Sequence, residues 1–274
     1  MLITVNGLIT QSYAAGERDR IVHVMTEEHG RLAVMVKGAG SNRTGGAAVC
    51  TQLFTYGNYE LYRGKGGDLY WFRNGSVLHS FYTLTTDLPR MALASYLCDV
   101  ASRHSAEEGG EEDCAILLRM LLNSLYTLHK ATRSHSIVKG VFELRAASLM
   151  GYCPDLTGCA FCGEGYPENA YLDVMNGCLV CADCQTKRNR LAGLDRLTEE
   201  LGERRVVCPV TSSVLAAMRY ALSAPEKKLF SFALKDAEEE RCFERAAETY
   251  LLNQLEQDFD TLHFYRSVAE LPST

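Results

Sequence analysis

Two closely spaced cysteine pairs constrain this chain more than any other feature of its sequence. Cys159-Ala-Phe-Cys162 and Cys181-Ala-Asp-Cys184 are separated by 18 residues. Each C-x-x-C segment folds back so that its two thiolates face one point, and two such segments complete a tetrahedron. The spacing is typical of paired zinc-binding motifs, and Gly163 supplies the backbone freedom that such turns use. We predict one structural Zn²⁺ held by these four cysteines.

The sequence leaves open a second choice of metal ligands. Cys178 and Cys181 also form a C-x-x-C pair, and Cys153 lies six residues before Cys159. The two apolar residues between 178 and 181 look like the core of a strand leading into the second turn. This favours the pairing of Cys181 with Cys184.

The predicted metal site is structural and not catalytic. Four thiolates leave no open coordination position, and none of the seven histidines lies between residues 153 and 184. We therefore predict that the chain is not an enzyme. The scattered cysteines at 50, 98, 114, 208 and 242 have apolar or amphipathic surroundings and are expected to be small buried side chains.

The composition is that of a globular protein. Of the 274 residues, 47% are hydrophobic and 23% are charged. The first ten residues lack the basic start and the long apolar stretch of a signal peptide, and no uncharged apolar run is long enough to span a bilayer. We expect a cytoplasmic protein without membrane contact.

Residues 1–80 predict strands. Apolar and polar residues alternate from Arg31 to Lys37, the period of a half-buried strand, and Gly30 before them suits a hairpin tip. The stretch 38–46, rich in Gly, Ser, Asn and Thr, indicates a loop. The remaining strands are expected near residues 3–9, 21–25, 52–62 and 68–78. Five strands of this size fit a small closed barrel of the OB type, a fold that can bind nucleic acid.

After residue 80 the apolar pattern changes to the 3.6-residue period of helices. Pro89 suits a first helical turn, and Gly151 with Pro154 marks a stop. Helices are expected from about residue 89, around 117–125, and at 136–150, 187–201, 211–223 and 236–256. The predicted fold class is α+β: an OB-type domain at 1–80 and an all-helical domain at 81–274, with a zinc ribbon-like insertion at about 153–190.

Charge is unevenly distributed. The net charge is -6, but residues 1–80 hold eight Lys and Arg against six Asp and Glu, whereas the remaining 194 residues hold 20 against 28. The candidate nucleic-acid-binding bases all lie on predicted strands or their loops: Arg18, Arg20, Arg31, Lys37, Arg43, Arg63 and Lys65. Aromatic residues interleave with these bases, as in barrels that bind single strands. A strand aromatic is more often core and a single Arg is usually solvated, so the residues alone leave DNA or RNA binding open.

Several segments, in this order, resemble the family of the bacterial DNA repair and recombination mediator RecO over nearly the whole chain. They are Gly16-Glu-Arg-Asp-Arg-Ile-Val22, Thr26 to Gly30, Val36-Lys-Gly-Ala39, Phe142-Glu-Leu-Arg145, Met150-Gly-Tyr-Cys-Pro154, the two C-x-x-C pairs and the tail from Tyr250 to Leu262. The resemblance implies binding of single- and double-stranded DNA, annealing of complementary strands and, together with RecR, loading of RecA onto strands coated by single-stranded DNA-binding protein (SSB).

The resemblance also implies roles for individual residues. Arg18, Arg20, Arg31 and Lys37 match the family's basic barrel residues, whereas Arg43, Arg63 and Lys65 lie in more variable loops. Lys139 and Arg145 would neutralise the acidic C-terminal tail of SSB. The implied location is the bacterial nucleoid.

Two other classes of function compete with this reading. One is a zinc-stabilised interaction scaffold that does not bind DNA, which the net acidity favours. The other is a zinc enzyme, which would require a histidine or carboxylate ligand in place of a thiolate.

Overall fold

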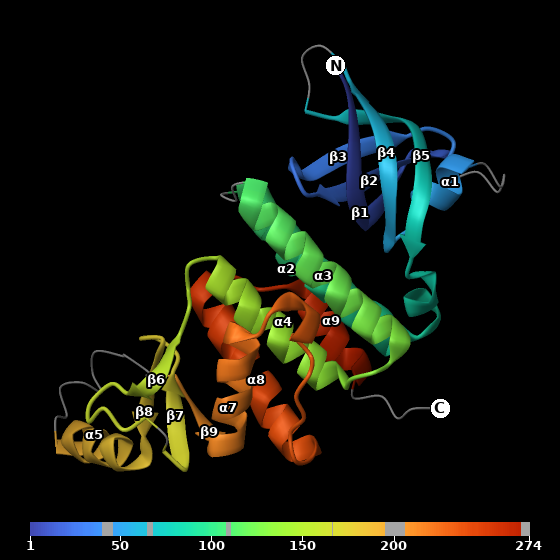
Figure 1. Ribbon diagram of the computed structural model, residues 1–274. Helices are drawn as coiled ribbons and strands as arrows, with labels where there is room; N and C mark the ends of the chain where they lie inside the picture. The colour runs from blue at the N-terminus through green and yellow to red at the C-terminus, as the bar shows by residue number, and fades with distance from the viewer. Residues whose placement is uncertain (40–45, 65–67, 108–110, 166, 195–205, 270–274) are drawn as a thin grey trace. The chain divides into compact units, whose positions relative to one another are not determined.

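The computed structural model describes residues 1–39, 46–64, 68–107, 111–165, 167–194 and 206–269 (Figure 1). The chain divides into two compact units, residues 1–132 with 259–274, and residues 133–258. No helix in the described ranges is long and apolar enough to cross a membrane.

The first unit contains the five predicted strands, which close into a barrel in the order β1-β2-β3-β5-β4 (Figure 1, blue to teal). Their bounds are β1 Leu2–Ala15, β2 Asp19–Thr26, β3 Gly30–Val36, β4 Thr55–Arg63 and β5 Tyr70–Ser80. The long strand β1 pairs with β2 through its second half and with β4 through its first half, and this double pairing closes the ring. Strands β3 and β5 complete it through a short parallel pairing.

The sequence alternation sets the inside and the outside of the barrel. In β3, Leu32, Val34 and Val36 are buried in the barrel core, and the residues between them face outward. Gly30 has a φ of 58°, so the β2–β3 hairpin tip uses the left-handed backbone that glycine permits. The prediction for this hairpin is confirmed.

The loop predicted at 38–46 falls mostly on residues 40–45, outside the described ranges. A short helix that we did not predict follows it, α1 Gly46–Cys50. The buried Tyr59 hydroxyl donates a hydrogen bond to the Cys50 carbonyl oxygen at 3.0 Å, which fixes the end of this helix to the barrel. Cys50 joins the apolar core, as expected for a scattered cysteine.

The first unit also contains helices from both ends of the predicted helical region: η1 Tyr82–Thr86, α2 Leu88–Glu107, α3 Glu111–Lys130 and α9 Asp260–Ala269. Thr261 donates a hydrogen bond to Asp99 of α2 at 2.9 Å, and the Arg103 guanidinium lies 4.4 Å from the Phe259 ring centroid. Through these contacts α9, although it follows the second unit in the chain, packs within the first unit. The predicted boundary between an OB-type domain at 1–80 and a helical domain at 81–274 stays a prediction.

The second unit combines helices with a small sheet: α4 His135–Leu149, β6 Asp155–Cys159, β7 Asn169–Asp173, β8 Cys178–Cys181, α5 Ala182–Leu194, β9 Val207–Thr211, α7 Ser212–Ser223, η2 Glu226–Lys228 and α8 Ala237–Leu255. The sheet order is β6-β8-β7-β9, so β9 joins it from beyond the insertion predicted at 153–190. The helix predicted at 187–201 begins earlier, at Ala182, and residues 195–205 lie outside the described ranges. Glu256, with a φ of 49°, ends α8 and separates it from α9.

A buried ion cluster joins α4 to α8. The Lys139 Nζ atom lies 2.6 Å from Glu248 Oε2, 2.9 Å from Glu143 Oε1 and 3.6 Å from Glu244 Oε1. Lys139 and Glu143 are fully buried. Burial disfavours the ammonium, but the three carboxylates outweigh it and raise the pKa of Lys139. The cluster is therefore charged inside the helical core.

Replacing Lys139 with Met should strongly destabilise the second unit. The substitution leaves the buried Glu143 carboxylate without its counter-charge, and breaking a buried pair in this way costs roughly 3–5 kcal/mol of unfolding free energy. Urea denaturation followed by far-UV circular dichroism measures the loss. The exposed Lys227 provides the control, because Lys227→Met should change stability by less than about 0.5 kcal/mol. An unchanged midpoint for Lys139→Met would contradict the argument.

Candidate metal centre and nucleic-acid interface

The described residues contain one cluster of side chains suited to a metal ion. Its four thiol sulfurs all lie within 4.8 Å of one another, and they belong to Cys159, Cys162, Cys181 and Cys184. A tetrahedral Zn²⁺ with bonds of about 2.3 Å places neighbouring sulfurs about 3.8 Å apart, and the Cys162 and Cys181 sulfurs are 3.7 Å apart. The donor set and its spacing therefore fit a Zn²⁺ ion.

Local structure brings the four thiols together. Cys159 ends β6 and Cys162 follows in the turn, where Gly163 has the expected positive φ of 77°. Cys181 ends β8, and Cys184 lies in the first turn of α5. The second pair thus sits where a strand passes directly into a helix. The apolar residues between 178 and 181 form a buried strand, as the sequence indicated.

The cluster also suits a cation electrostatically. Burial opposes ionisation of Cys159, but hydrogen bonds from the backbone N–H groups of Cys181, Phe161 and Cys162 stabilise its thiolate. Together with the Cys162 thiol they hold the pKa of Cys159 at about 6. Cys184, whose thiol is held mainly by hydrogen bonding with Cys181, has its pKa raised to about 12. The Cys159 thiolate thus forms readily, whereas the raised pKa of Cys184 means that this thiol needs a positive charge beside it to ionise.

The two alternative ligands lie outside the cluster. Cys178 begins β8, where it is opposite Asp173 of β7, and its pKa is raised, first by burial and then by that carboxylate. Cys153 is exposed and precedes β6. The spacing therefore favours the register with Cys181 and Cys184, and ligation itself stays a prediction.

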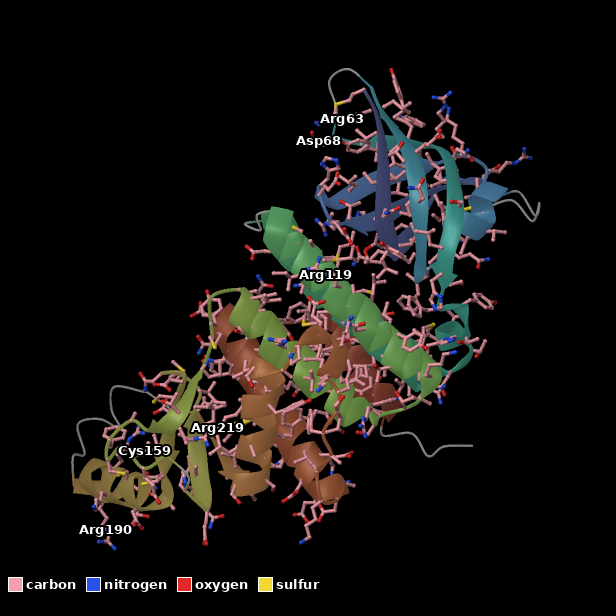
Figure 2. The ribbon with its side chains drawn as sticks, viewed as in Figure 1. Arg63, Asp68, Arg119, Cys159, Arg190 and Arg219 are labelled. Carbon is pink, nitrogen blue, oxygen red and sulfur yellow. The ribbon has the colours of Figure 1, made fainter. Side chains whose placement is uncertain are left out.

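Arg219 of α7 fastens the metal-binding segment to the helices of its unit, and the sequence patterns did not single it out. Its Nε atom donates to the Leu156 carbonyl oxygen at 2.7 Å, and one terminal nitrogen donates to the Gly165 carbonyl oxygen at 2.6 Å. These two carbonyls flank the first cysteine pair (Figure 2, where Cys159 and Arg219 are labelled). Because a lone Arg on a helix has no local signal, only the folded chain reveals this contact.

The second cysteine pair has a similar support. Arg188 of α5 donates to Asp173 Oδ2 at 2.8 Å, and the Asp173 side chain is buried. The same guanidinium lies 5.0 Å from the ring centroid of the exposed Phe161, between the first two cysteines. Arg188 therefore links α5, β7 and the first turn of the site.

The predicted basic residues of the barrel occupy two places. Arg18 is exposed in the β1–β2 turn, and Arg20 is the second residue of β2, where its Nε atom donates to Ser12 Oγ at 2.9 Å. Lys37 follows β3 at the same end, because Val36 pairs with Arg20. Arg31 lies at the opposite end of β3. Through the described parts of the chain, none of these four forms an ion pair.

Asp19, which lies between Arg18 and Arg20 in the sequence, has a backbone partner. Asp19 Oδ1 accepts a hydrogen bond from the Gly38 N–H at 2.9 Å. Arg63, at the end of β4, does pair with the exposed Asp68 at 2.5 Å (Figure 2), unlike these four bases. Arg43 and Lys65 lie outside the described residues.

Comparison with known proteins agrees with this arrangement. The family model for the recombination protein O N terminal matches residues 1–81, and that for its C terminal matches residues 85–204. The DNA repair protein RecO of Acetivibrio thermocellus is 26% identical over 266 residues, covering 97% of each chain. That of Symbiobacterium thermophilum is 30% identical over 187 residues, covering 67% of this chain and 71% of the relative.

The chain belongs to the RecO family of DNA repair proteins.

The structure corrects one expectation for a RecO partner site. Lys139, expected to neutralise an acidic protein tail, is fully buried and already surrounded by three carboxylates. It has no exposed surface to offer and acts inside the helical core. Arg145 is half-buried, and its guanidinium donates to the carbonyl oxygens of Leu222 and Ala224 at the end of α7. A contact of Arg145 with a partner stays a prediction.

Single cysteine substitutions distinguish the two candidate ligand pairs, Cys181 with Cys184 and Cys178 with Cys181. Cys184→Ser should lose bound zinc, because it removes one of the four clustered thiols, whereas Cys178→Ser should retain one zinc per chain. Inductively coupled plasma mass spectrometry of the purified variants measures the metal. Zinc loss in the Cys178 variant alone would show that the other register is used.

Removal of the metal should also lower stability. A structural zinc site contributes roughly 10–16 kcal/mol in small zinc domains, comparable with the whole stability of a domain, about 5–15 kcal/mol. Verified zinc-free protein should therefore melt at least about 10 °C below the zinc-loaded form, as measured by differential scanning calorimetry. Equal melting temperatures would contradict a structural role.

Proposed function

We propose that this RecO-family chain binds single- and double-stranded DNA, anneals complementary strands and helps load RecA onto SSB-coated single strands. The observation that carries the proposal is the cationic end of the barrel. Arg18 in the β1–β2 turn, Arg20 in β2 and Lys37 just after β3 all lie at this end of the barrel, and among the described residues no acid lies within ion-pair distance of them. Unpaired cations on a rigid sheet are suited to phosphate groups.

The net charge of -6 does not prevent this. At physiological ionic strength, exposed charges more than about 8 Å apart are largely screened from each other. A phosphate at the barrel therefore responds mainly to the bases near it. Annealing then follows from simple electrostatics, because cations that neutralise two strands reduce the repulsion that keeps the strands apart.

The remaining features have supporting roles in this proposal. The closed five-stranded order β1-β2-β3-β5-β4 is consistent with an OB-type barrel, which we take as the DNA-binding domain at 1–80. One Zn²⁺ bound by the four clustered cysteines stabilises the helical half. RecR and the acidic tail of SSB are the proposed protein partners, and the bacterial nucleoid is the proposed location.

The second candidate is a zinc-stabilised interaction scaffold without direct DNA contact. It is favoured by the acidic composition outside the barrel. Binding of a labelled oligonucleotide by the purified chain distinguishes the two candidates, because the scaffold would bind none.

Affinity for DNA should fall steeply with salt. If the bases at 18, 20, 31 and 37 contact about four phosphates, a slope near -0.7 per contact implies a roughly 50-fold loss of affinity for single strands between 50 and 200 mM salt. Reversing both Arg18 and Arg20 to Glu should weaken binding to all sequences about equally and reduce the slope by about 1.4. Fluorescence anisotropy of labelled oligonucleotides measures both effects.

A matched control makes the same change of net charge in the other compact unit. Lys227 and Lys228 are exposed there, and their reversal to Glu should leave the salt slope unchanged. Salt-independent binding, or equal losses in the two double variants, would contradict a phosphate-binding barrel.

A further inference from the structure

A row of apolar side chains crosses the outer face of the barrel at its cationic end. The backbone register pairs its members directly from strand to strand. In order around the ring they are Tyr13, Ile21, Met35, Trp71, Tyr62 and Leu2, which we call the apolar row. Direct partners across a sheet lie on the same face, with Cβ atoms about 4.5–5.5 Å apart. The row is therefore one continuous feature.

The row faces outward. In β5 and β4 its neighbours along the strand pack in the barrel core: Tyr70 and Phe72 on either side of Trp71, and Leu61 before Tyr62. Trp71 keeps 37% of its surface exposed and Tyr62 49%. Large aromatic side chains exposed side by side on adjacent strands mark a binding surface more often than isolated ones do.

Positive charge borders the row. The Lys37 ammonium lies 4.9 Å from the Trp71 ring centroid, and Lys37 is exposed. Arg20 precedes Ile21 of the row in β2. An exposed cation–π contact contributes only about 0.5–1 kcal/mol, so Lys37 can leave the ring when an anion approaches. Flat hydrophobic faces beside mobile cations are complementary to nucleotides, which combine flat bases with phosphates.

We propose that the apolar row, centred on Trp71 and Tyr62, is a stacking surface for unpaired bases of single-stranded nucleic acid. This inference rests on the proposed function and adds a specificity to it. A duplex offers the barrel its phosphates, but its bases are already stacked on one another. Only a single strand can place bases on Trp71 while Lys37 moves to a neighbouring phosphate.

Trp71 is also a built-in reporter, because the chain has one tryptophan. Stacking of a base on the indole ring quenches its emission. Titration with a 20-nucleotide single strand should therefore quench the protein's tryptophan fluorescence, whereas a duplex of the same length should bind without comparable quenching.

Substitutions of Trp71 and binding of an abasic strand test how much base stacking contributes to affinity. Trp71→Ala should lower the affinity for the single strand by roughly tenfold, from the usual size of base–aromatic stacking, and change duplex affinity by less than about twofold. Trp71→Phe, which keeps an aromatic face, should restore part of the loss. Tyr126→Ala is the matched control, since Tyr126 is an exposed aromatic residue of the same unit with Lys130 5.6 Å from its ring centroid.

An abasic strand of the same length tests the same point with the wild-type chain, so that a folding defect in a variant cannot affect the result. It carries the phosphates without the bases, so the wild-type chain should bind it roughly tenfold more weakly than the normal strand. Equal affinity for the two strands with unchanged Trp71 emission would overturn the stacking surface and leave the proposed DNA binding intact. No binding to any of the probes would overturn both, and would assign the apolar row to a protein partner.

Discussion

The backbone pairing of β1 is the constraint on which the proposed DNA surface depends. This strand pairs with β2 along one half and with β4 along the other, and so fixes the register of the ring. Because side chains alternate between faces, a slip of one residue would exchange the inner and outer sets. The same register that buries Val22 and Val34 therefore exposes Trp71 and places it beside Lys37.

The metal-binding segment shows a different kind of constraint. Its sheet is short, and its position depends on polar contacts with the helices around it, chiefly those of Arg219 and Arg188. In the cluster itself, one thiol ionises easily and another, that of Cys184, has its pKa raised to about 12. A Zn²⁺ ion would supply the positive charge that favours ionisation of Cys184, so metal binding and the folding of this segment are coupled.

The sequence predicted what depends on local period and spacing, and it missed what depends on distant partners. The five strands, the main helices and the cysteine spacing follow from alternation, the 3.6-residue period and glycine placement. Strand β9 has no such signal, because it is a strand through pairing with β7. Lys139 was misjudged for the same reason: nothing near it in the sequence except Glu143 reveals that α8 brings two more carboxylates to it. Likewise, Arg219 has partners more than fifty residues away.

The aromatic residues of the barrel show how strand register decides which of them are buried and which are exposed. The barrel strands contain Tyr59, Tyr62, Tyr70 and Trp71, and composition alone does not say which of them are buried. In the structure Tyr59 is buried with its hydroxyl satisfied by backbone carbonyls, whereas Trp71 and Tyr62 oppose each other on the outer face. A cation beside a buried ring would stabilise only the fold, but a cation beside an exposed ring can be exchanged for a phosphate. The proposed binding of a polyanion by one end of the barrel therefore depends on this difference of face and not on the number of basic residues.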